Sequence, residues 1–278
     1  MIIELLIFSY CISVVQNVPG SSFRRKPKFQ QLIIFGDSLT DDGVEAQGLS
    51  HGFTRFSNGP VWPEYLNTML ETGGNYSNYA YSGAKSDNDN FYFTGWSGIL
   101  WQINNYLEST MTIPSNSLIV LQLGGNNDMF NGDNKTVEVT ENAKNAVMRL
   151  AQRGARKMLA LNLADLSKAP GVPNAQAGQR MSTLVSEANT RLKVALDSSA
   201  VASFSRFSLL DLKLFDLNAA TNQALASFSN TAEPYTHHRN NTRPDDIKNY
   251  AFFDEFHPST FFHLKIAQAI NEFVKNWN

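Results

Sequence analysis

The sequence predicts an α/β protein whose central parallel sheet has about five strands and is covered by helices. Short apolar runs alternate along the chain with segments of helical periodicity, and this alternation is typical of such a sheet. Each apolar run is followed by Gly, Asn, Asp or Ser, so polar loops should meet at the carboxyl edge of the sheet. With 278 residues, 42% of them hydrophobic, the chain can bury one large core. We therefore expect one domain over residues 29–278.

The predicted strands are the short apolar runs that end at turn-forming residues. They cover residues 31–35, 77–81, 117–123, 157–163 and 203–210. The predicted helices are the periodic segments that lie between and after the strands. They cover residues 61–70, 98–107, 137–152, 179–196 and 260–274. Ser259 is expected to cap the last helix, whereas residues 218–250 have weak periodicity and are expected to form a long loop near the functional site.

The charge and cysteine content of the chain exclude several classes of function. The formal net charge is -2, from 23 basic and 25 acidic residues, so there is no broad positive surface for a polyanion. We expect no nucleic-acid partner, and we expect a monomer. Cys11 is the only cysteine, which excludes disulfides and a cysteine-based zinc site from the rest of the chain.

The first residues form an apolar segment that has two interpretations. Residues 1–15 resemble the hydrophobic region of a secretory signal, and Gly20, Ser21 and Ser22 offer processing points. Glu4, however, stands where such signals carry positive charge, and the basic residues follow the apolar run instead of preceding it. One interpretation is a cleaved signal, which would make the protein secreted or extracytoplasmic. The other is an N-terminal extension over residues 1–28.

A serine stands where the first predicted strand ends. Ser38 belongs to a Gly-Asp-Ser-Leu motif that begins at Gly36. A serine hydroxyl is a weak nucleophile at neutral pH and needs an imidazole to accept its proton. Near the other end of the chain, Asp254 and His257 are three residues apart, so one turn can supply both the base and the carboxylate that orients it. The pattern predicts acyl transfer through Ser38, with His257 as base and Asp254 as its partner.

The oxyanion that forms during acyl transfer needs hydrogen-bond donors. The backbone N–H of Ser38, the backbone N–H of Gly83 and the side-chain amide of Asn127 are the candidates. Gly83 follows the second predicted strand and Asn127 follows the third, whereas Asp254 and His257 precede the last helix. All of these residues map to the same edge of a parallel sheet.

Acidic residues near Ser38 raise the alternative of a metal site. Asp37, Asp41 and Asp42 lack the alternating spacing of a calcium loop, and no two histidines have the helical spacing of a zinc motif. His237 and His238 are sequence neighbours and would point apart in an extended segment. The glycine-containing loops also lack the lysine of a P-loop. We expect no metal and no nucleotide cofactor.

Four sequence blocks resemble those of the GDSL, or SGNH, hydrolases. They are residues 35–39, Gly83, residues 125–128 and residues 254–257, in the family's order and at matching places relative to the predicted strands. The resemblance implies a flavodoxin-like three-layer α/β/α sandwich that hydrolyses esters through Ser38, His257 and Asp254. It also implies oxyanion donors at Ser38, Gly83 and Asn127. Residues 55–62 and 162–167 are further similar to segments of the plant-type and bacterial phospholipase branches of the family.

Each block taken alone has a simpler structural interpretation. A Gly-Asp-Ser-Leu sequence after a strand commonly forms a turn, Gly83 can permit a tight turn, and Asp254 can cap one. The occurrence of all four blocks in order favours catalysis over these separate interpretations.

Three functional hypotheses remain. The first is a hydrolase of carboxylic esters, acting on a small-molecule or lipid ester such as a lysophospholipid, with a membrane surface or an acetylated polysaccharide as alternative sources of substrate. The second is an acyltransferase with the same acyl-enzyme, and the third is a non-catalytic module that binds glycans or lipids. Eight aromatic residues crowd the loops after the first two strands and belong either to the core or to an acyl or sugar pocket. They are Phe53, Phe56, Trp62, Phe91, Tyr92, Phe93, Trp96 and Trp101.

Overall fold

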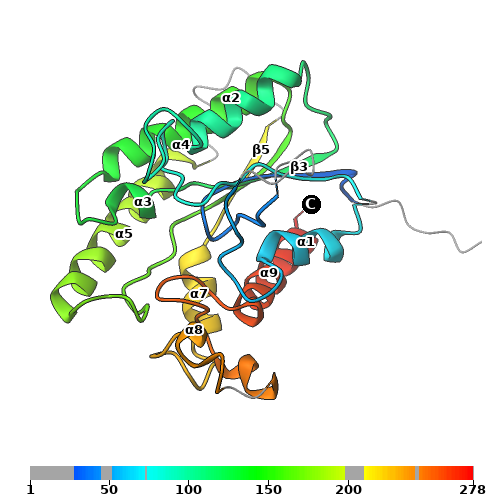
Figure 1. Cartoon of the computed structure of the whole chain (residues 1–278). Coiled ribbons are helices and arrows are strands. Elements are labelled where there is room, and N and C mark those ends of the chain that lie inside the picture. Colours follow the sequence, from blue (N-terminus) through cyan, green and yellow to red (C-terminus); the bar gives the residue numbers. More distant parts are fainter. Residues whose placement is uncertain (1–27, 45–51, 73, 198–209, 242–243, 278) are drawn as a thin grey trace, which may run out of the picture.

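Five parallel strands form the centre of the structure, which is a computed structural model (Figure 1). It describes residues 28–44, 52–72, 74–197, 210–241 and 244–277. The strands are β1 (Gln31–Phe35), β2 (Tyr76–Asn78), β3 (Ser117–Gln122), β4 (Lys157–Leu161) and β5 (Asp211–Phe215). Their order across the sheet is β2-β1-β3-β4-β5, and every neighbouring pair is parallel. Their carboxyl ends therefore meet at a single edge.

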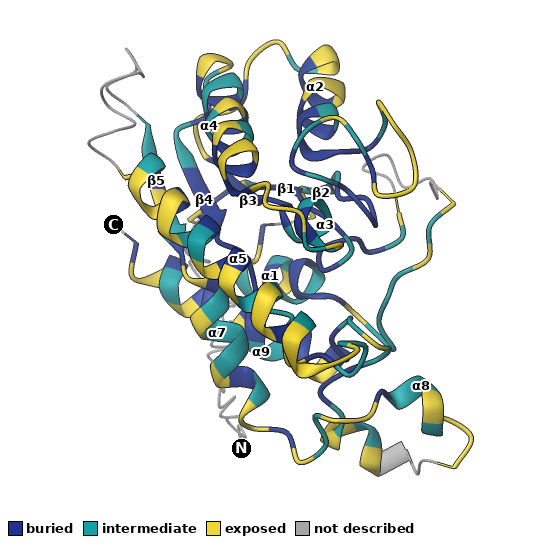
Figure 2. Cartoon of the chain, turned by 90° about the vertical axis from the view of Figure 1, so that its left-hand side faces the viewer, coloured by how far each residue is buried: buried dark blue, intermediate teal, exposed yellow. Residues whose placement is uncertain are grey.

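Helices cover both faces of the sheet, and the predicted α/β/α sandwich is confirmed (Figure 2). One face carries α2 (Ile99–Ser109), α4 (Thr136–Gln152) and α5 (Ala175–Ala195). The other carries α1 (Trp62–Leu70), α7 (Leu217–Leu225) and α9 (Thr260–Lys275). Successive strand residues point to opposite faces, so Ile33 and Phe35 of β1 pack into the first core whereas Leu32 and Ile34 pack into the second. Burial on both faces explains why the inner strands are unbroken apolar runs.

β3 and β4 end one and two residues before their predicted ends, and the other two strands that differ from prediction depart further. β2 ends at Asn78, but hydrogen bonding to β1 continues beyond it, since Tyr79 N–H donates to Ile34 O and Tyr81 N–H donates to Gly36 O. Of the strand predicted at residues 203–210, only Leu210 is among the described residues, and the fifth strand of the sheet begins directly after it. β5 lies at the edge of the sheet, and its charged residues interrupt the apolar run that would have predicted a strand.

The five predicted helices correspond to α1, α2, α4, α5 and α9, with ends that differ by a few residues. The predicted cap of α9 is confirmed, because the Ser259 side chain accepts a hydrogen bond from Phe262 N–H. Residues 1–27, which include the apolar segment with two interpretations, lie outside the described residues. Within the described residues, no helix is both long and apolar enough to cross a membrane.

The long loop predicted for residues 218–250 is wrong in part, because this segment contains helices. Most of α7 lies in it, followed by α8 (Tyr235–His238) and the 3₁₀ helix η1 (Pro244–Asn249), which project beyond α7 in Figure 1. Asp216 caps α7 by accepting the N–H of Ala219, and Leu217 and Ala224 pack into the second core. The asparagines and threonines of α7 weaken its sequence periodicity, whereas tertiary packing stabilises it as a helix.

The same segment reaches the carboxyl edge of the sheet. Tyr235 N–H donates to Phe252 O and Thr236 N–H donates to Phe253 O, at 3.0 and 2.9 Å. These bonds attach the start of α8 to the chain that leads directly into Asp254.

Candidate active site

Ser38 lies in a tight turn directly after β1. The carbonyl of Asp37 accepts the N–H groups of Thr40 and Asp41, both at 2.9 Å. The Asp37 carboxylate accepts the N–H of Leu39 at 3.0 Å. The turn thus holds the serine at the carboxyl edge of the sheet through hydrogen bonds on both sides of it.

Two buried glutamines hold this turn from neighbouring elements. Gln122, at the end of β3, accepts the N–H of Asp37 at 2.8 Å and donates to its carboxylate at 2.9 Å. Gln102 of α2 accepts the N–H of Gly36 at 3.1 Å and donates to its carbonyl at 2.9 Å. A Cβ at Gly36 would stand 2.8 Å from Gln122 Oε1, so only glycine fits. Burial raises the pKa of Asp37, although its hydrogen bonds with Gln122 and Leu39 oppose the shift.

His257 lies between Ser38 and Asp254. Its Nε2 is 2.9 Å from Ser38 Oγ, and its Nδ1 is 2.8 and 2.9 Å from the two carboxylate oxygens of Asp254. An ionised carboxylate only accepts hydrogen bonds, so Nδ1 carries a proton and Nε2 can accept the proton of the serine hydroxyl.

The Asp254 carboxylate stays ionised near neutral pH. Burial alone would raise its pKa, but the hydrogen bond and charge of His257, together with the N–H groups of Phe256 and His257, hold the pKa below its ordinary value. Both N–H groups donate to Asp254 Oδ1, at 3.0 and 2.8 Å. The carboxylate is therefore fixed in the orientation that it needs to hold the imidazole.

The segment before α1 holds His257 from the other side. The ring of Phe56 stacks on the imidazole, with the ring centroids 4.6 Å apart. Ser57 Oγ donates to Pro258 O at 3.2 Å, and the side chain of Asn58 accepts Thr260 N–H at 2.9 Å. These three contacts restrict both the imidazole ring and the backbone that follows it.

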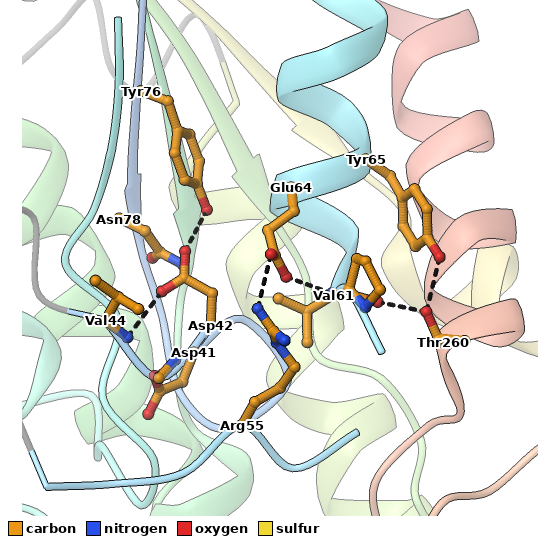
Figure 3. Close-up of polar contacts among 12 residues, drawn as sticks. Asp41, Asp42, Val44, Arg55, Val61, Glu64, Tyr65, Tyr76, Asn78 and Thr260 are labelled. Atoms are coloured by element: carbon orange, nitrogen blue, oxygen red, sulfur yellow. Dashed lines mark hydrogen bonds and ion pairs between the residues drawn. The ribbon is translucent and has the colours of Figure 1, made fainter. Parts of the chain in front are cut away.

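Figure 3 shows how the same segment is joined to the start of α9. Thr260 Oγ1 donates to the carbonyl of Pro60 at 2.8 Å and lies 2.7 Å from the hydroxyl of Tyr65. Arg55 pairs with Glu64 at 2.7 Å, and Glu64 also accepts the N–H of Val61 at 2.8 Å. Residues 55–65 thus form a support for the turn that carries Asp254 and His257.

Gly83 and Asn127 line the same cleft as Ser38. Gly83 has a φ of 82°, and a Cβ there would stand 2.6 Å from Asn90 Oδ1, so the position requires glycine. Within the described part of the chain, the N–H groups of Ser38 and Gly83 donate to no other group. Asn127 Nδ2 donates to Ala84 O at 2.9 Å, which orients the amide and leaves its second N–H available.

Two aspartates, Asp41 buried and Asp128 half-buried, hold the loop that carries Gly83. Asp41, in the Ser38 turn, accepts the N–H and the hydroxyl of Ser82 at 2.7 and 2.8 Å. Asp128, next to Asn127, accepts the N–H and the hydroxyl of Ser86, both at 2.8 Å. The loop after β2 is thus tied on one side to the serine and on the other to the asparagine. Burial raises the pKa of Asp128, although its hydrogen bonds with Ser86 oppose the shift.

A cleft of about 240 Å³ begins at the Ser38 hydroxyl and the His257 ring. Beyond the polar groups it is lined by apolar and aromatic side chains. They are Leu39, Phe56, Phe91, Tyr92, Phe130, Leu166 and Phe256. The rings of Phe130 and Phe256 meet edge to face with centroids 5.0 Å apart, and Phe91 meets Phe130 at 5.7 Å. The cleft therefore suits a substrate with a polar carbonyl group and an apolar chain.

Comparison of the chain with models of known protein families identifies the family to which it belongs. The family model described as GDSL-like Lipase/Acylhydrolase matches residues 32–270, which is most of the chain. The chain belongs to this family. The resemblance of its four sequence blocks to the GDSL hydrolases is thereby confirmed.

Three curated relatives are similar to this GDSL chain over part of their length. The thermolabile hemolysin of Vibrio parahaemolyticus is 25% identical, in a match over 97% of this chain and 69% of the relative. The phosphatidylcholine-sterol acyltransferase of Aeromonas hydrophila is 28% identical, over 52% of this chain and 48% of the relative. The secreted effector protein SseJ of Salmonella typhimurium is 21% identical, over 88% of this chain and 63% of the relative.

A solved structure supports the fold independently. A member of the lipolytic G-D-S-L family from Veillonella parvula is similar with a TM-score of 0.56 at 17% identity, over 88% of this chain and 98% of that one. The likeness extends to the five-stranded parallel sheet with helices on both sides.

The eight aromatic residues singled out in the sequence divide between the cleft, the core and an adjoining cluster. Phe56, Phe91 and Tyr92 line the cleft of this GDSL protein, whereas Trp62 is buried in the core. The remaining four, together with Tyr81, form a cluster of ring contacts beside the cleft. They are Phe53, Phe93, Trp96 and Trp101.

Sequence reasoning missed several residues that shape the site. Phe130 and Phe256 line the cleft, although Phe256 lies within one recognised GDSL block and Phe130 lies two residues after another, so both could have been found there. Gln102 and Gln122 have no sequence signal at all, because a polar residue in an apolar run has no distinctive spacing. The clamps formed by Asp41 and Asp128 likewise depend on partners more than forty residues away.

The histidines at 237 and 238 lie on a short helix, so the extended conformation considered for them is wrong. His237 Nε2 is 2.9 Å from Glu255 Oε1, and His238 Nε2 is 2.8 Å from Glu233 Oε2. Among the residues that the structure describes, no three side chains are grouped in the way that a metal ion requires.

Replacing Asp128 by alanine is expected to lower both stability and activity. The change leaves the buried N–H of Ser86 without its acceptor and also removes the 3.2 Å bond from Gly125 N–H. We expect the free energy of unfolding to fall by about 3 kcal/mol, measured by urea denaturation. We also expect kcat/KM to fall by about tenfold to a hundredfold, because Gly83 and Asn127 lose their common support.

Asp128→Asn is the matched control for this prediction. Its amide oxygen can still accept both N–H groups and its NH₂ can donate to the Ser86 hydroxyl, so most of the stability and activity should remain. Equal losses in the two variants would show that the charge of Asp128, and not its hydrogen bonds, supports the loop.

Proposed function

We propose that this protein is a serine hydrolase that cleaves carboxylic esters through an acyl-enzyme on Ser38. The observation that carries the proposal is the position of His257, 2.9 Å from the serine hydroxyl and 2.8 Å from the Asp254 carboxylate at the wall of an apolar cleft. A serine, an imidazole and a carboxylate in this order activate the serine for attack on a carbonyl group.

In the proposed mechanism, Ser38 Oγ attacks the ester carbonyl while His257 Nε2 accepts its proton. The N–H groups of Ser38 and Gly83 and the amide of Asn127 stabilise the oxyanion, and each such donor contributes about 3 kcal/mol to transition-state stabilisation. His257 then donates its proton to the leaving alcohol. A water molecule, activated by the same imidazole, attacks the acyl-enzyme and releases the carboxylic acid. Asp254 stabilises the imidazolium throughout.

The lining of the cleft supports a lipid-like acyl chain as the substrate group. Seven apolar or aromatic side chains surround the space beyond the serine, and the cleft of about 240 Å³ is larger than an acetyl group requires. Each methylene group buried against such a lining contributes about 0.8 kcal/mol. We therefore propose medium or long acyl esters, including lysophospholipids, as the substrate class.

Hydrolysis of p-nitrophenyl esters from acetate to palmitate tests this proposal. We expect kcat/KM to rise by at least about tenfold between the acetate and the octanoate, because additional methylene groups enter the apolar cleft. Ser38→Ala should remove the activity on every ester. A maximum at acetate would favour a carbohydrate acetylesterase, and a folded protein inactive on all esters would favour a non-catalytic binding role.

Acyl transfer is the second candidate function, supported by the similarity to a relative named phosphatidylcholine-sterol acyltransferase. The same acyl-enzyme serves both reactions, and only the acceptor differs. A test is to add a sterol or a long-chain alcohol to the ester assay and measure the new ester by mass spectrometry. Ester formation in competition with water would establish transferase activity, whereas release of free acid alone would establish a hydrolase.

We also propose that the protein acts outside the cytoplasm. The support is the apolar segment at residues 1–15 and the similarity to a relative named as a secreted effector. Expression of the full chain in its own host, followed by N-terminal sequencing of protein from the medium, tests this location.

A further inference from the structure

Three consecutive aromatic residues project from the loop between β2 and α2. Phe91, Tyr92 and Phe93, hereafter the aromatic tip, are 36%, 65% and 51% exposed. The other exposed large apolar residues among those described are isolated from one another in the sequence. The aromatic tip also begins an uncharged stretch, because no charged residue occurs between Asp89 and Glu108.

The backbone of this loop holds the aromatic tip in its exposed position. The buried side chain of Asn90 donates to Ser82 O and to Ser97 Oγ, both at 2.8 Å, and accepts the N–H of Tyr92 at 3.0 Å. Phe91 N–H donates to Gly83 O at 2.7 Å. The loop is thus fixed by hydrogen bonds on both sides of the aromatic tip, and the exposure of the rings follows from a defined backbone.

The aromatic tip continues directly into the cleft beside Ser38. Phe91 and Tyr92 are part of the lining, and Phe91 contacts Phe130 inside it. A partner that covers the aromatic tip therefore also covers the mouth of the cleft. A partner that does not supply the substrate would block the entrance to the cleft. A partner that does supply it can deliver the substrate directly to Ser38.

We propose that the aromatic tip docks the mouth of the cleft onto a zwitterionic lipid surface, from which an acyl chain enters. This inference rests on the proposed function, because docking would serve to deliver an ester to Ser38. Lipid binding itself does not require hydrolysis. Aromatic side chains with an apolar body settle at the boundary between lipid and water, and Tyr92 adds a hydroxyl that can remain hydrated there.

The small size of the aromatic tip argues against a protein partner. From side-chain areas of about 150–250 Å² and the exposed fractions above, the three rings offer roughly 300 Å². A stable protein–protein interface buries about 800 Å² on each partner. Insertion of a few aromatic rings into lipid needs no such area.

The ring geometry and the nearby charges further restrict the kind of partner that can bind the aromatic tip. Phe91 and Tyr92 are inclined at 81° to each other and Tyr92 and Phe93 at 63°, so the tip presents no flat platform on which a sugar ring could stack. The closest charged residues in the sequence are Asp87 and Asp89, which disfavour an anionic membrane. A zwitterionic surface agrees with both observations.

The test measures binding of the Ser38→Ala protein to sucrose-loaded phosphatidylcholine vesicles by sedimentation. The serine variant prevents hydrolysis of the vesicles during the assay. Phe93 is the residue to change, because it is exposed but does not line the cleft. We expect Phe93→Ser to raise the apparent Kd for vesicles at least tenfold and Tyr92→Ser/Phe93→Ser to raise it further. Binding should persist in 0.5 M NaCl, since apolar insertion is not screened by salt.

Met111→Ser is the matched control, because Met111 is 92% exposed and follows α2 toward the start of β3, at the opposite edge of the sheet. It should bind vesicles as the parent protein does. Equal binding by the Phe93 and Met111 variants would overturn the proposal. Binding only to anionic vesicles, or retention on insoluble acetylated polysaccharide without vesicle binding, would also overturn it.

Activity on a water-soluble ester separates this inference from the proposed function. With Ser38 restored, Phe93→Ser should hydrolyse p-nitrophenyl acetate at the parent rate and lose at least tenfold on phosphatidylcholine vesicles. Failure of the parent to hydrolyse any ester would contradict the proposed function and leave the vesicle-binding result to decide the docking surface. An equal loss of hydrolysis rate on both substrates would contradict docking, and it would show that Phe93 instead helps to hold the active site in place.

Discussion

Replacing His257 by alanine is expected to lower kcat/KM for ester hydrolysis by about four orders of magnitude or more. Without the imidazole, no other side chain among the described residues lies within hydrogen-bond distance of Ser38 Oγ to accept its proton, since His257 Nε2 is the atom that lies 2.9 Å away. The oxyanion donors remain, so a small residual rate should persist. The measurement is initial-rate hydrolysis of the best p-nitrophenyl ester, with circular dichroism and thermal unfolding to show that the variant is folded.

His237→Ala is the matched control for this experiment. His237 belongs to the neighbouring α8, and its side chain is 56% exposed and paired with Glu255. Its loss should change kcat/KM by no more than a few-fold, because a surface ion pair contributes little. Asp254→Asn should lie close to His257→Ala, since an amide cannot hold the imidazole in the required tautomer. Activity of folded His257→Ala within tenfold of the parent would remove His257 from the mechanism.

Lowering the pH from 7 to 3 is expected to reduce the free energy of unfolding by about 4 kcal/mol through one residue, His263. His263 of α9 is fully buried, and neither ring nitrogen has a hydrogen-bond partner among the described residues. Burial, with smaller contributions from the charges of His257 and Arg55, lowers the pKa of His263 from 6.5 to about 3. The unfolded chain therefore takes up a proton at a higher pH than the folded protein. Its contribution to stability is complete above pH 6.5 and is lost as the pH falls toward 3.

His263→Leu tests this prediction, because leucine fills a similar volume and takes up no proton. Urea denaturation at pH 7.5 and 4.5 should show a difference in the free energy of unfolding that is about 3 kcal/mol smaller in the variant than in the parent. His237→Leu, which removes an exposed histidine, should change that difference by less than about 1 kcal/mol. If the His263 variant retains the full difference, the imidazole is protonated in the folded protein despite its burial.

The inner strands and most helices were predictable because the apolar pattern that indicates each of them lies within its own short segment of sequence. Residues 31–35 are apolar on both faces of a central strand, and their bounds agree with β1. Prediction fails where one face is exposed or where packing outweighs propensity. β5 is an edge strand with Asp211 and Lys213 in it, and α7 is rich in asparagine but packs Leu217 and Ala224 into the core.

The candidate site likewise has a part that the sequence predicted and a part that it did not. The order of Ser38, Gly83, Asn127, Asp254 and His257 relative to the strands was sufficient to place them at one edge of the sheet. Their supports were not predictable, because each one joins segments that are distant in the sequence. Gln122 reaches Asp37 across 85 positions, and Ser57 reaches Pro258 across 201.

The sequence by itself determined the fold class, the family and the set of chemical groups that meet at the carboxyl edge. It could do so because strand periodicity, turn residues and motif order are properties of short segments. Tertiary structure alone decided which aromatic residues line the cleft, which project from it and which fill the core. It also decided how the serine turn and the oxyanion loop are held, because a buried polar group can be satisfied only by whichever partner the fold brings within about 3 Å of it.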